Sequence, residues 1–372
     1  MRLVHLTTSG GWGGREMYPL ALAAKQAARG LQVSLVAKRD TPLAGRLAGS
    51  AIEHDLLADG PYFDPAACFA LSRIFRRRKP DIVHVHLSRD LLLVHLAGLL
   101  SGRKISVILH KHIASAGDKR DFLHRWLFGR TRAVVAVSEF VRRSLLASCP
   151  VRPEQVRVIF NGVDAERFVA PPDEPARARL RREMGAESEA AVIAGVVGRL
   201  EMRKGQEWFV EAAGRLKDSH PHILFAIAGT PEGGYGAVIQ HRIDQLGLAG
   251  RVRLLGHCAD TRAFYAALDI LVVPSWEEAF GLVAAEGMLS GLPVVAANSG
   301  ALPEFIREGV NGFLVPLRDV PALAAVISRL ADDPKLRRNT GRRAREWAGE
   351  HLDMELILDR LDELYRECVG EN

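Results

Sequence analysis

Short apolar runs alternate with longer amphipathic segments along the first half of the chain. The runs are rich in β-branched residues and predict buried strands, whereas the segments between them have the apolar spacing of helices. The predicted strands are residues 3–7, 32–37, 82–86, 105–109, 133–137 and 156–160. The predicted helices are residues 16–29, 65–78, 89–100 and 139–149. This alternation favours a parallel sheet with helices on both faces.

A second alternation begins at residue 191, after a polar, proline-bearing tract over 171–189 that predicts a linker leading into a short helix. Its predicted strands are residues 191–197, 223–228, 252–255, 270–273, 293–296 and 312–315. Three helical patterns close the chain, at 321–332, 334–350 and 353–368. With 372 residues, the chain exceeds the usual size of a single core, so we expect two α/β domains.

The composition is that of a globular protein, with 48% hydrophobic and 25% charged residues. The longest apolar window, 91–100, is too short to span a bilayer, and the first residues lead directly into a strand pattern rather than a signal peptide. The four cysteines lack any C-x-x-C spacing, so we expect neither a disulfide framework nor a zinc site. A reducing cytoplasm is the expected location.

Charge is distributed unevenly, with a net +13 over residues 1–160 and −7 over the remainder. A basic half suits nucleic acid, anionic lipid or a phosphorylated substrate. Residues 119–132 interleave basic residues with aromatic and leucine side chains, which is typical of a helix at a membrane surface. A solvated helix that packs its apolar stripe on the core explains the same pattern. Nucleic acid is not expected, because no recognition module is evident.

The most informative stretch is 274–300, which reads as a strand end, a tight loop, a helix and a second strand. Gly281 permits the turn, and two carboxylates frame it, Glu278 before the turn and Glu286 on the helix. Open α/β sheets bind ligands beyond the carboxyl ends of their strands, which is where these side chains are expected. A carboxylate there suits a sugar diol, since it accepts two hydroxyl protons.

This stretch resembles the signature of the retaining GT-B glycosyltransferases of family 4, also called glycosyl transferases group 1. The matching positions are Pro274-Ser275, Glu278, Phe280-Gly281, Glu286 and Gly291-Leu292-Pro293-Val294-Val295. The family prefers glycine where this chain has Ala279. The resemblance covers nearly the whole chain and is densest from about 133 to 316.

The resemblance implies two Rossmann-like α/β/α domains that face each other across a cleft. Residues 1–165 would form the acceptor-binding domain and 166–350 the nucleotide-sugar-binding domain. The last segment, 351–372, would be a helix that packs back on the N-terminal domain.

A strand that ends at Gly198-Arg199, followed by Lys204 at a helix start, predicts two cations and a helix dipole at one place. In the family this pair binds the diphosphate of the donor. No D-x-D triplet occurs in the sequence, so we expect Arg199 and Lys204 to replace a metal ion in stabilising the leaving group. The expected reaction therefore needs no metal and no cofactor, and a UDP-sugar is the expected substrate.

The resemblance assigns further roles in donor binding. Glu278 would hold the donor sugar in position, together with the backbone at Phe280, Gly281 and Leu282, and Glu286 would bind the ribose. Gly229, which ends the predicted strand 223–228, would let the backbone approach the nucleotide. Retention would follow if the acceptor attacks from the face that the leaving phosphate vacates.

A glycine-rich loop over 9–16 follows the first predicted strand and offers backbone N–H groups to an anion. The dinucleotide fingerprint G-x-G-x-x-G fails here, because Glu16 stands at its third glycine position. The loop instead resembles the N-terminal loop of the family. That resemblance places Gly14 at the donor, and Gly13 and Glu16 at the acceptor.

Histidines recur at alternate positions in two predicted strands, His84 with His86 and His110 with His112. The family often has one histidine at the second strand end that touches donor or acceptor, and His112 fits that position better than His110. We therefore expect His112 to join the catalytic residues Arg199, Lys204 and Glu278, and His110 to lie on the acceptor side. Structural histidines or alternating metal ligands remain alternatives, although no carboxylate partner is evident.

These features predict a transferase that moves a sugar from a nucleoside diphosphate to an acceptor hydroxyl, in the synthesis of lipopolysaccharide or another cell-surface glycan. The basic half predicts a lipid-linked or phosphorylated acceptor and a peripheral contact with the inner face of the cytoplasmic membrane. The alternatives are an epimerase, a soluble sugar-phosphate transferase and a non-catalytic nucleotide-sugar sensor.

Overall fold

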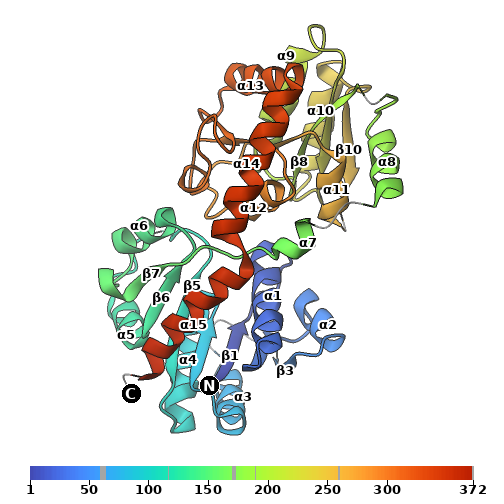
Figure 1. The fold of residues 1–372 in the computed structure, drawn as a ribbon. Helices are drawn as coiled ribbons and strands as arrows, with labels where there is room; N and C mark the ends of the chain where they lie inside the picture. Colours follow the sequence, from blue (N-terminus) through green and yellow to red (C-terminus); the bar gives the residue numbers. More distant parts are fainter. Residues whose placement is uncertain (59–63, 116, 170–172, 189, 259, 371–372) are drawn as a thin grey trace. The chain divides into compact units, whose positions relative to one another are not determined.

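The computed structural model describes residues 1–58, 64–115, 117–169, 173–188, 190–258 and 260–370. The chain forms two compact units, which we describe separately. Unit 1 comprises Met1–Asn161 and Glu355–Asn372, and unit 2 comprises Gly162–Met354. Figure 1 shows that the C-terminal helix α15 lies with the N-terminal strands in unit 1. Every helix in the described part of the chain is too short or too polar to cross a membrane.

Unit 1 is built on a parallel sheet with the strand order β3-β2-β1-β4-β5-β6-β7. The strands are β1 (Arg2–Thr7), β2 (Gln32–Lys38), β3 (Glu53–Leu57), β4 (Ile82–Val85), β5 (Ser106–Lys111), β6 (Ala133–Ala136) and β7 (Val156–Val158). Strands β4, β5 and β6 are buried along their whole length, as expected for parallel strands with helices on both faces.

Strand β3 is a difference from the sequence prediction, which placed no strand at residues 53–57. It lies at the edge of the sheet and pairs only with β2 among the described strands. Its sequence, EHDLL, is mostly polar, and only Leu57 is fully buried. An edge strand that is half exposed carries no apolar run, so the hydrophobic pattern did not reveal it.

The helices of unit 1 are α1 (Gly14–Ala28), α2 (Pro42–Ala48), α3 (Pro65–Arg78), α4 (Leu91–Ser101), α5 (Phe122–Arg130), α6 (Glu139–Ser148) and α15 (Met354–Gly370). Helix α15 lies beside α1, because Arg29 near the end of α1 forms ion pairs with Glu355 at 2.6 Å and Asp359 at 2.7 Å. Tyr365 of α15 is fully buried. The last helix is therefore part of the core of unit 1.

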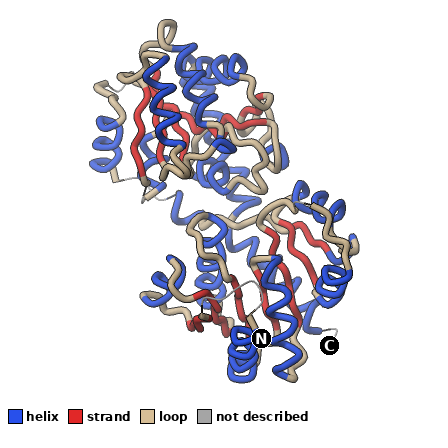
Figure 2. Tube along the Cα trace, turned by 180° about the vertical axis from the view of Figure 1, so that it is seen from behind, coloured by secondary structure: helices blue, strands red, loops and turns tan. Residues whose placement is uncertain are grey.

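Unit 2 contains a six-stranded parallel sheet with the order β10-β9-β8-β11-β12-β13, whose strands are coloured red in Figure 2. They are β8 (Val192–Val197), β9 (Ile223–Ala228), β10 (Val252–Gly256), β11 (Ile270–Val273), β12 (Val294–Ala297) and β13 (Phe313–Val315). The helices are α7 (Ala165–Val169), α8 (Glu174–Glu183), α9 (Gln206–Leu216), α10 (Tyr235–Gln245), α11 (Thr261–Ala267), α12 (Leu282–Leu289), α13 (Val320–Asp332) and α14 (Pro334–Leu352). Helices α9, α10 and α13 pack together, and α12 packs on α14.

Helix α8 occupies much of the tract that the sequence suggested as a linker. Two arginines fasten it to the rest of unit 2, since Arg177 donates to the carbonyl of Ala266 at 3.0 Å and Arg181 makes a buried ion pair. Arg181 is 7% exposed, and its guanidinium donates to Oδ2 of Asp269 at 2.9 Å and to the carbonyls of Ala267 and Ala191, each at 2.8 Å. A helix with a polar sequence can pack on the domain when its buried charged side chain is fully hydrogen-bonded, as Arg181 is here.

We expect the buried ion pair between Arg181 and Asp269 to contribute to the stability of unit 2. Replacing Arg181→Met should lower its free energy of unfolding by about 3 kcal/mol, because Asp269 and two carbonyls lose a buried partner. Arg179→Met on the same helix is the matched control, since Arg179 is exposed and only 3.8 Å from Glu183, and it should change stability by less than about 0.5 kcal/mol. Urea unfolding measured by hydrogen exchange of unit 2 amides tests this, and equal effects of the two variants would contradict it.

Candidate functional site

The loops that follow β8 and β11 meet at the carboxyl edge of the sheet in unit 2. Gly205 follows the short 3₁₀ turn Met202–Lys204 and has a φ of +71°. A Cβ atom there would lie 2.4 Å from the carbonyl oxygen of Pro274, so only glycine allows this approach. The close contact places Lys204 next to the loop that begins at Ser275.

Lys204 and Glu278 form an ion pair across these two loops. Nζ of Lys204 donates to Oε1 of Glu278 at 2.5 Å, and the two side chains are 27% and 16% exposed. Both residues line a small hollow together with Val197, Ser275 and Val283. The structure thus brings together two of the residues that the sequence assigned to catalysis.

Arg199 takes a different set of partners. Its guanidinium donates to Oε2 of Glu232 at 2.9 Å and lies 3.6 Å from Glu201. Its side chain is 52% exposed, so the guanidinium is held at the surface of the β8 loop. Sequence analysis missed Glu232 and Glu201, because neither belongs to a recognisable motif.

The start of α12 lies beside the same hollow, where Val283 contributes to the lining. Gly281 precedes the helix with a φ of +96°. Its carbonyl accepts from Ala284 and Ala285, whereas the N–H groups of Leu282 and Val283 lie before the first helical hydrogen bond. The positive end of the helix dipole therefore lies beside the hollow, where it would favour an anion. Phe280 is 3% exposed and packs against Phe305 with ring centroids 5.5 Å apart, so its side chain belongs to the core.

Glu286 lies one turn after Val283 on α12 and faces α11. Its Oε2 accepts a hydrogen bond from the hydroxyl group of Tyr265 at 2.8 Å. Burial raises the pKa of Glu286 to about 6, and the opposing effects of the Tyr265 hydroxyl and of the Arg167 charge are smaller. Tyr265 is a site residue that sequence analysis missed, since an aromatic residue on a helix carries no signal of this role.

Gly229 has a packing role in the structure. Its N–H donates to the carbonyl of Gly256 at 2.6 Å, and a Cβ atom would lie 1.8 Å from the carbonyl oxygen of Gly198. The glycine lets the loops after β8 and β9 come together. Its contact with a nucleotide remains a prediction.

In unit 1, Glu16 holds the glycine-rich loop in place. It is 4% exposed, and its Oε1 accepts hydrogen bonds from Oγ of Ser9 at 2.6 Å and from Nε of Arg15 at 2.8 Å. Gly13 and Gly14 form the beginning of α1, directly before this carboxylate. Glu16 therefore positions the loop, and direct contact with an acceptor remains a prediction.

Two further buried ionisable groups lie at the carboxyl edge of the sheet in unit 1. Asp90 accepts from the backbone N–H and the hydroxyl group of Thr8 at 3.0 and 2.6 Å, and burial raises its pKa to about 6. Nζ of Lys111 donates to Oγ of Ser88 at 3.2 Å, and burial lowers the pKa of Lys111 to about 8. Sequence analysis did not single out either residue.

His110 and His112 lie one above the other, with ring centroids 4.3 Å apart and planes 11° apart. His110 is inside β5 and is fully buried, whereas His112 follows the last residue of the strand and is 8% exposed. Burial lowers the pKa of His112 to about 3. His112 is thus the nearer of the two to the strand end, and it is a neutral base there.

Comparisons with known proteins agree with this arrangement. Residues 12–167 match the family described as Glycosyltransferase Family 4, and residues 179–347 match the family described as Glycosyl transferases group 1. A D-inositol 3-phosphate glycosyltransferase from Corynebacterium glutamicum is 30% identical over 97% of this chain and 93% of that protein. The chain belongs to glycosyltransferase family 4.

Solved structures confirm the predicted GT-B fold of this glycosyltransferase. A glycosyltransferase from Rickettsia africae has a TM-score of 0.90 and 21% identity over 100% of this chain and 99% of that chain. HepE from Anabaena, solved in complex with UDP, has a TM-score of 0.86 and 24% identity over 99% of this chain and 100% of that chain.

The hydrogen bond from Tyr265 leads to a testable prediction about the pKa of Glu286. Replacing Tyr265→Phe removes a hydrogen bond that favours the carboxylate, so the pKa of Glu286 should rise further above its usual range. Infrared titration of the carboxyl band tests this, with Glu286→Gln used to identify the band. A band that titrates at the same pH in wild type and Tyr265→Phe would show that the hydroxyl group does not act on Glu286.

Proposed function

We propose that this glycosyltransferase transfers a sugar from a nucleoside diphosphate, with UDP as the expected nucleotide, to an acceptor hydroxyl with retention and without a metal ion. The observation that carries the proposal is the hollow where Lys204, Glu278 and the start of α12 meet. A cation and a helix N-terminus suit a diphosphate, and a carboxylate beside them suits the hydroxyl groups of a sugar. The UDP complex of HepE, a protein of the same fold, agrees with this choice of donor.

In the proposed reaction, the bond between the sugar and the β-phosphate breaks, and negative charge develops on the phosphate oxygen. Lys204, Arg199 and the N–H groups at Gly281 and Leu282 stabilise that charge. Glu278 holds the sugar hydroxyls, and Glu286 holds the ribose. The acceptor hydroxyl attacks from the face that the phosphate leaves, and the departing phosphate oxygen takes its proton. Positioning and electrostatics then supply most of the rate acceleration.

A phosphorylated acceptor is supported by the charges of unit 1. Arg15 and Lys119 lie close enough to Lys111 to act on its pKa, so three cations gather near the end of β5. The relative from Corynebacterium glutamicum is named for inositol 3-phosphate, which is an acceptor of this chemical class. We therefore propose a phosphorylated or lipid-linked polyol as the acceptor, in the synthesis of lipopolysaccharide or another surface glycolipid.

The proposal is tested by incubating the protein with radiolabelled nucleotide sugars, with and without inositol 3-phosphate or a lipid-linked glycan acceptor. Transfer of label only when acceptor is present supports the proposal, and thermal shift with each nucleotide sugar identifies the donor. Conversion of the sugar without acceptor would indicate an epimerase. Binding without any turnover would indicate a sensor, and either outcome would overturn the proposal.

If Lys204 and Arg199 stabilise the leaving phosphate, replacing either should lower kcat. Lys204→Ala or Arg199→Ala should lower kcat by about a hundredfold, or about 3 kcal/mol, because each removes charge stabilisation from the leaving phosphate. Activity of the wild type should persist in EDTA. Arg203→Ala, at an exposed neighbouring cation, is the control and should leave kcat nearly unchanged. Loss of activity in EDTA, combined with full activity of Lys204→Ala, would contradict the metal-free scheme.

Peripheral membrane contact is part of the proposal, and α5 is the surface expected to make it. Phe122 is 85% and Leu123 is 42% exposed, next to the exposed cations Arg120 and Arg125. Apolar side chains beside exposed cations suit an anionic lipid surface.

The double replacement Phe122→Ser/Leu123→Ser should therefore weaken binding to phosphatidylglycerol vesicles by about tenfold, since two apolar side chains no longer insert. Val238→Ser, at a residue 46% exposed on α10, is the control. Vesicle co-sedimentation measures both. Equal binding of the wild type to neutral and anionic vesicles would contradict the proposed contact with an anionic membrane surface.

A further inference from the structure

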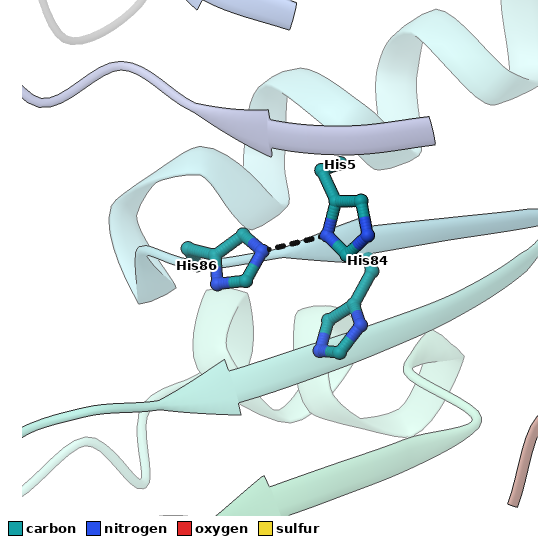
Figure 3. Close-up of side chains that lie close together, drawn as sticks. All are labelled: His5, His84 and His86. Atoms are coloured by element: carbon teal, nitrogen blue, oxygen red, sulfur yellow. Dashed lines mark hydrogen bonds between the residues drawn. The ribbon is translucent and has the colours of Figure 1, made fainter. Parts of the chain in front are cut away.

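Five buried histidines lie on one face of the sheet in unit 1, and α1 and α15 contribute polar partners to them. His5 comes from β1, His84 and His86 from β4 and its end, and His110 and His112 from β5 and its end. His5 pairs with His84 in the strand register, and alternate residues of a strand share a face. The rings of His84 and His86 are stacked at 4.9 Å, and Figure 3 shows His5 joined to His86 by a hydrogen bond.

The first of two hydrogen-bonded chains begins at the side-chain amide of Gln26 on α1. Oε1 of Gln26 is 2.6 Å from Nε2 of His5, and Nδ1 of His5 is 2.9 Å from Nε2 of His86. Nδ1 of His86 is in turn 3.0 Å from Nε2 of His112. The amide is thus connected to the ring at the end of β5 through two intervening histidines.

The second chain begins at the nitrogen of the same amide. Nε2 of Gln26 donates to the hydroxyl group of Tyr365 at 3.2 Å, and that oxygen is 2.6 Å from Nδ1 of His84. Nε2 of His84 is 3.2 Å from Nδ1 of His110. Both chains therefore share one amide group, and each ends at a different histidine of β5.

The position of every proton in the first chain follows from the amide oxygen. Burial lowers the pKa of all five histidines, so each ring is neutral and carries one proton. The amide oxygen can only accept, so His5 donates from Nε2 and accepts at Nδ1. Because Nδ1 of His5 accepts, His86 must donate from Nε2 and accept at Nδ1, and His112 must in turn donate from Nε2. His112 consequently has its proton on Nε2, and its Nδ1 is a bare acceptor.

The far end of the second chain supports this orientation of the amide. Tyr365 accepts from Gln26 and donates to His84, so His84 and His110 also carry their protons on Nε2. Nε2 of His110 and Oδ1 of Asn161 are both buried without a well-formed hydrogen bond in the described structure, yet Asn161 raises the pKa of His110. That direction is consistent with Asn161 acting as an acceptor for the proton of His110. A reversed amide would leave two acceptors facing each other.

A metal centre is the competing explanation for these residues. His5, His84 and His86 offer nitrogens within 4.8 Å of one another, as do His86, His110 and His112. A metal needs three lone pairs directed at one point. Here each of the pairs His5–His86, His86–His112 and His84–His110 uses one nitrogen as a donor and the other as an acceptor, so the lone pairs are already engaged.

We propose that Gln26 is a positioning residue that fixes the tautomer of His112, so that Nδ1 of His112 accepts a hydrogen bond from a substrate hydroxyl group at the end of β5. This inference rests on the proposed function, because it places substrate at that strand end. Arg15 and Lys111 act on His112 in the same sense, since their charges disfavour its protonated form. Gln26 itself is fully buried and acts only through the chain of rings.

The test uses full-length protein labelled with ¹⁵N at histidine, in which long-range ¹H–¹⁵N spectra distinguish protonated from bare ring nitrogens. In the wild type, all five rings should show a protonated Nε2. Gln26→Glu keeps an acceptor beside His5 and should keep the tautomer of His112. Gln26→Met has a similar size but no acceptor, so His112 should show both tautomers, and kcat should fall by about twofold or more as the competent fraction declines.

A purely structural role for Gln26 gives the opposite ranking, because a buried glutamate destabilises the fold more than methionine does. Tyr365→Phe is a second variant, which interrupts only the second chain. It removes the donor to Nδ1 of His84, and His112 should keep its proton on Nε2. If every replacement of Gln26 fails to fold, the wild-type spectrum still tests the proposal, because it requires a protonated Nε2 and a bare Nδ1 on His112.

A protonated Nδ1 on His112 in the wild type would overturn the proposal, as would a single Nε2–H tautomer in Gln26→Met. An unchanged kcat in Gln26→Met with mixed tautomers would overturn the role in the reaction. Stoichiometric zinc uptake that shifts the ring nitrogens of His5 and His86 would establish a metal centre instead. The spectra need no substrate, so a failure of the proposed function would appear separately, as absence of sugar transfer with the tautomers as expected.

Discussion

The ion pair between Lys204 and Glu278 joins two loops that lie 74 residues apart in the chain, at the carboxyl edge of the sheet in unit 2. Both side chains are partly buried, so each charge depends on the other for compensation. A diphosphate carries more negative charge than one carboxylate and would compete for Lys204. In the proposed reaction, donor binding would therefore release Glu278 toward the sugar hydroxyls. The contact that joins the two loops would then link phosphate binding to sugar binding.

Buried polar groups are satisfied in two ways in this chain. Charged pairs hold buried groups in both units, such as Arg181 with Asp269 in unit 2 and Arg15 with Glu16 in unit 1. The histidine cluster of unit 1 instead uses neutral rings, because five adjacent histidines at one sheet face cannot all be protonated at a small cost. In the proposed mechanism the phosphate takes the acceptor proton. A neutral acceptor at His112 is consistent with that scheme, since it orients a hydroxyl group without removing its proton.

The apolar runs predicted most of the strands, because parallel strands buried on both faces need continuous hydrophobic sequence. The same signal failed for the edge strand β3 and underestimated α8, where hydrogen bonds and an ion pair replace apolar burial. The glycine and strand-end spacing predicted that Lys204 and Glu278 each follow a strand, and the family resemblance assigned both to the donor site. It did not predict Tyr265, Glu232 or Gln26, because the role of each comes from a helix or loop brought close only by tertiary packing.

A single neutral amide is a suitable group to set the tautomers of five rings. A carboxylate at position 26 would direct the first chain equally well, but it would accept from Tyr365 as well as from His5 and so reverse the second chain. His110 would then present a bare Nε2 to Oδ1 of Asn161, and two buried acceptors would face each other. An apolar residue would leave the first chain without the acceptor that sets its direction. Of these three choices, only the amide offers one acceptor and one donor, so only the amide gives both β5 histidines a defined proton position without burying a charge.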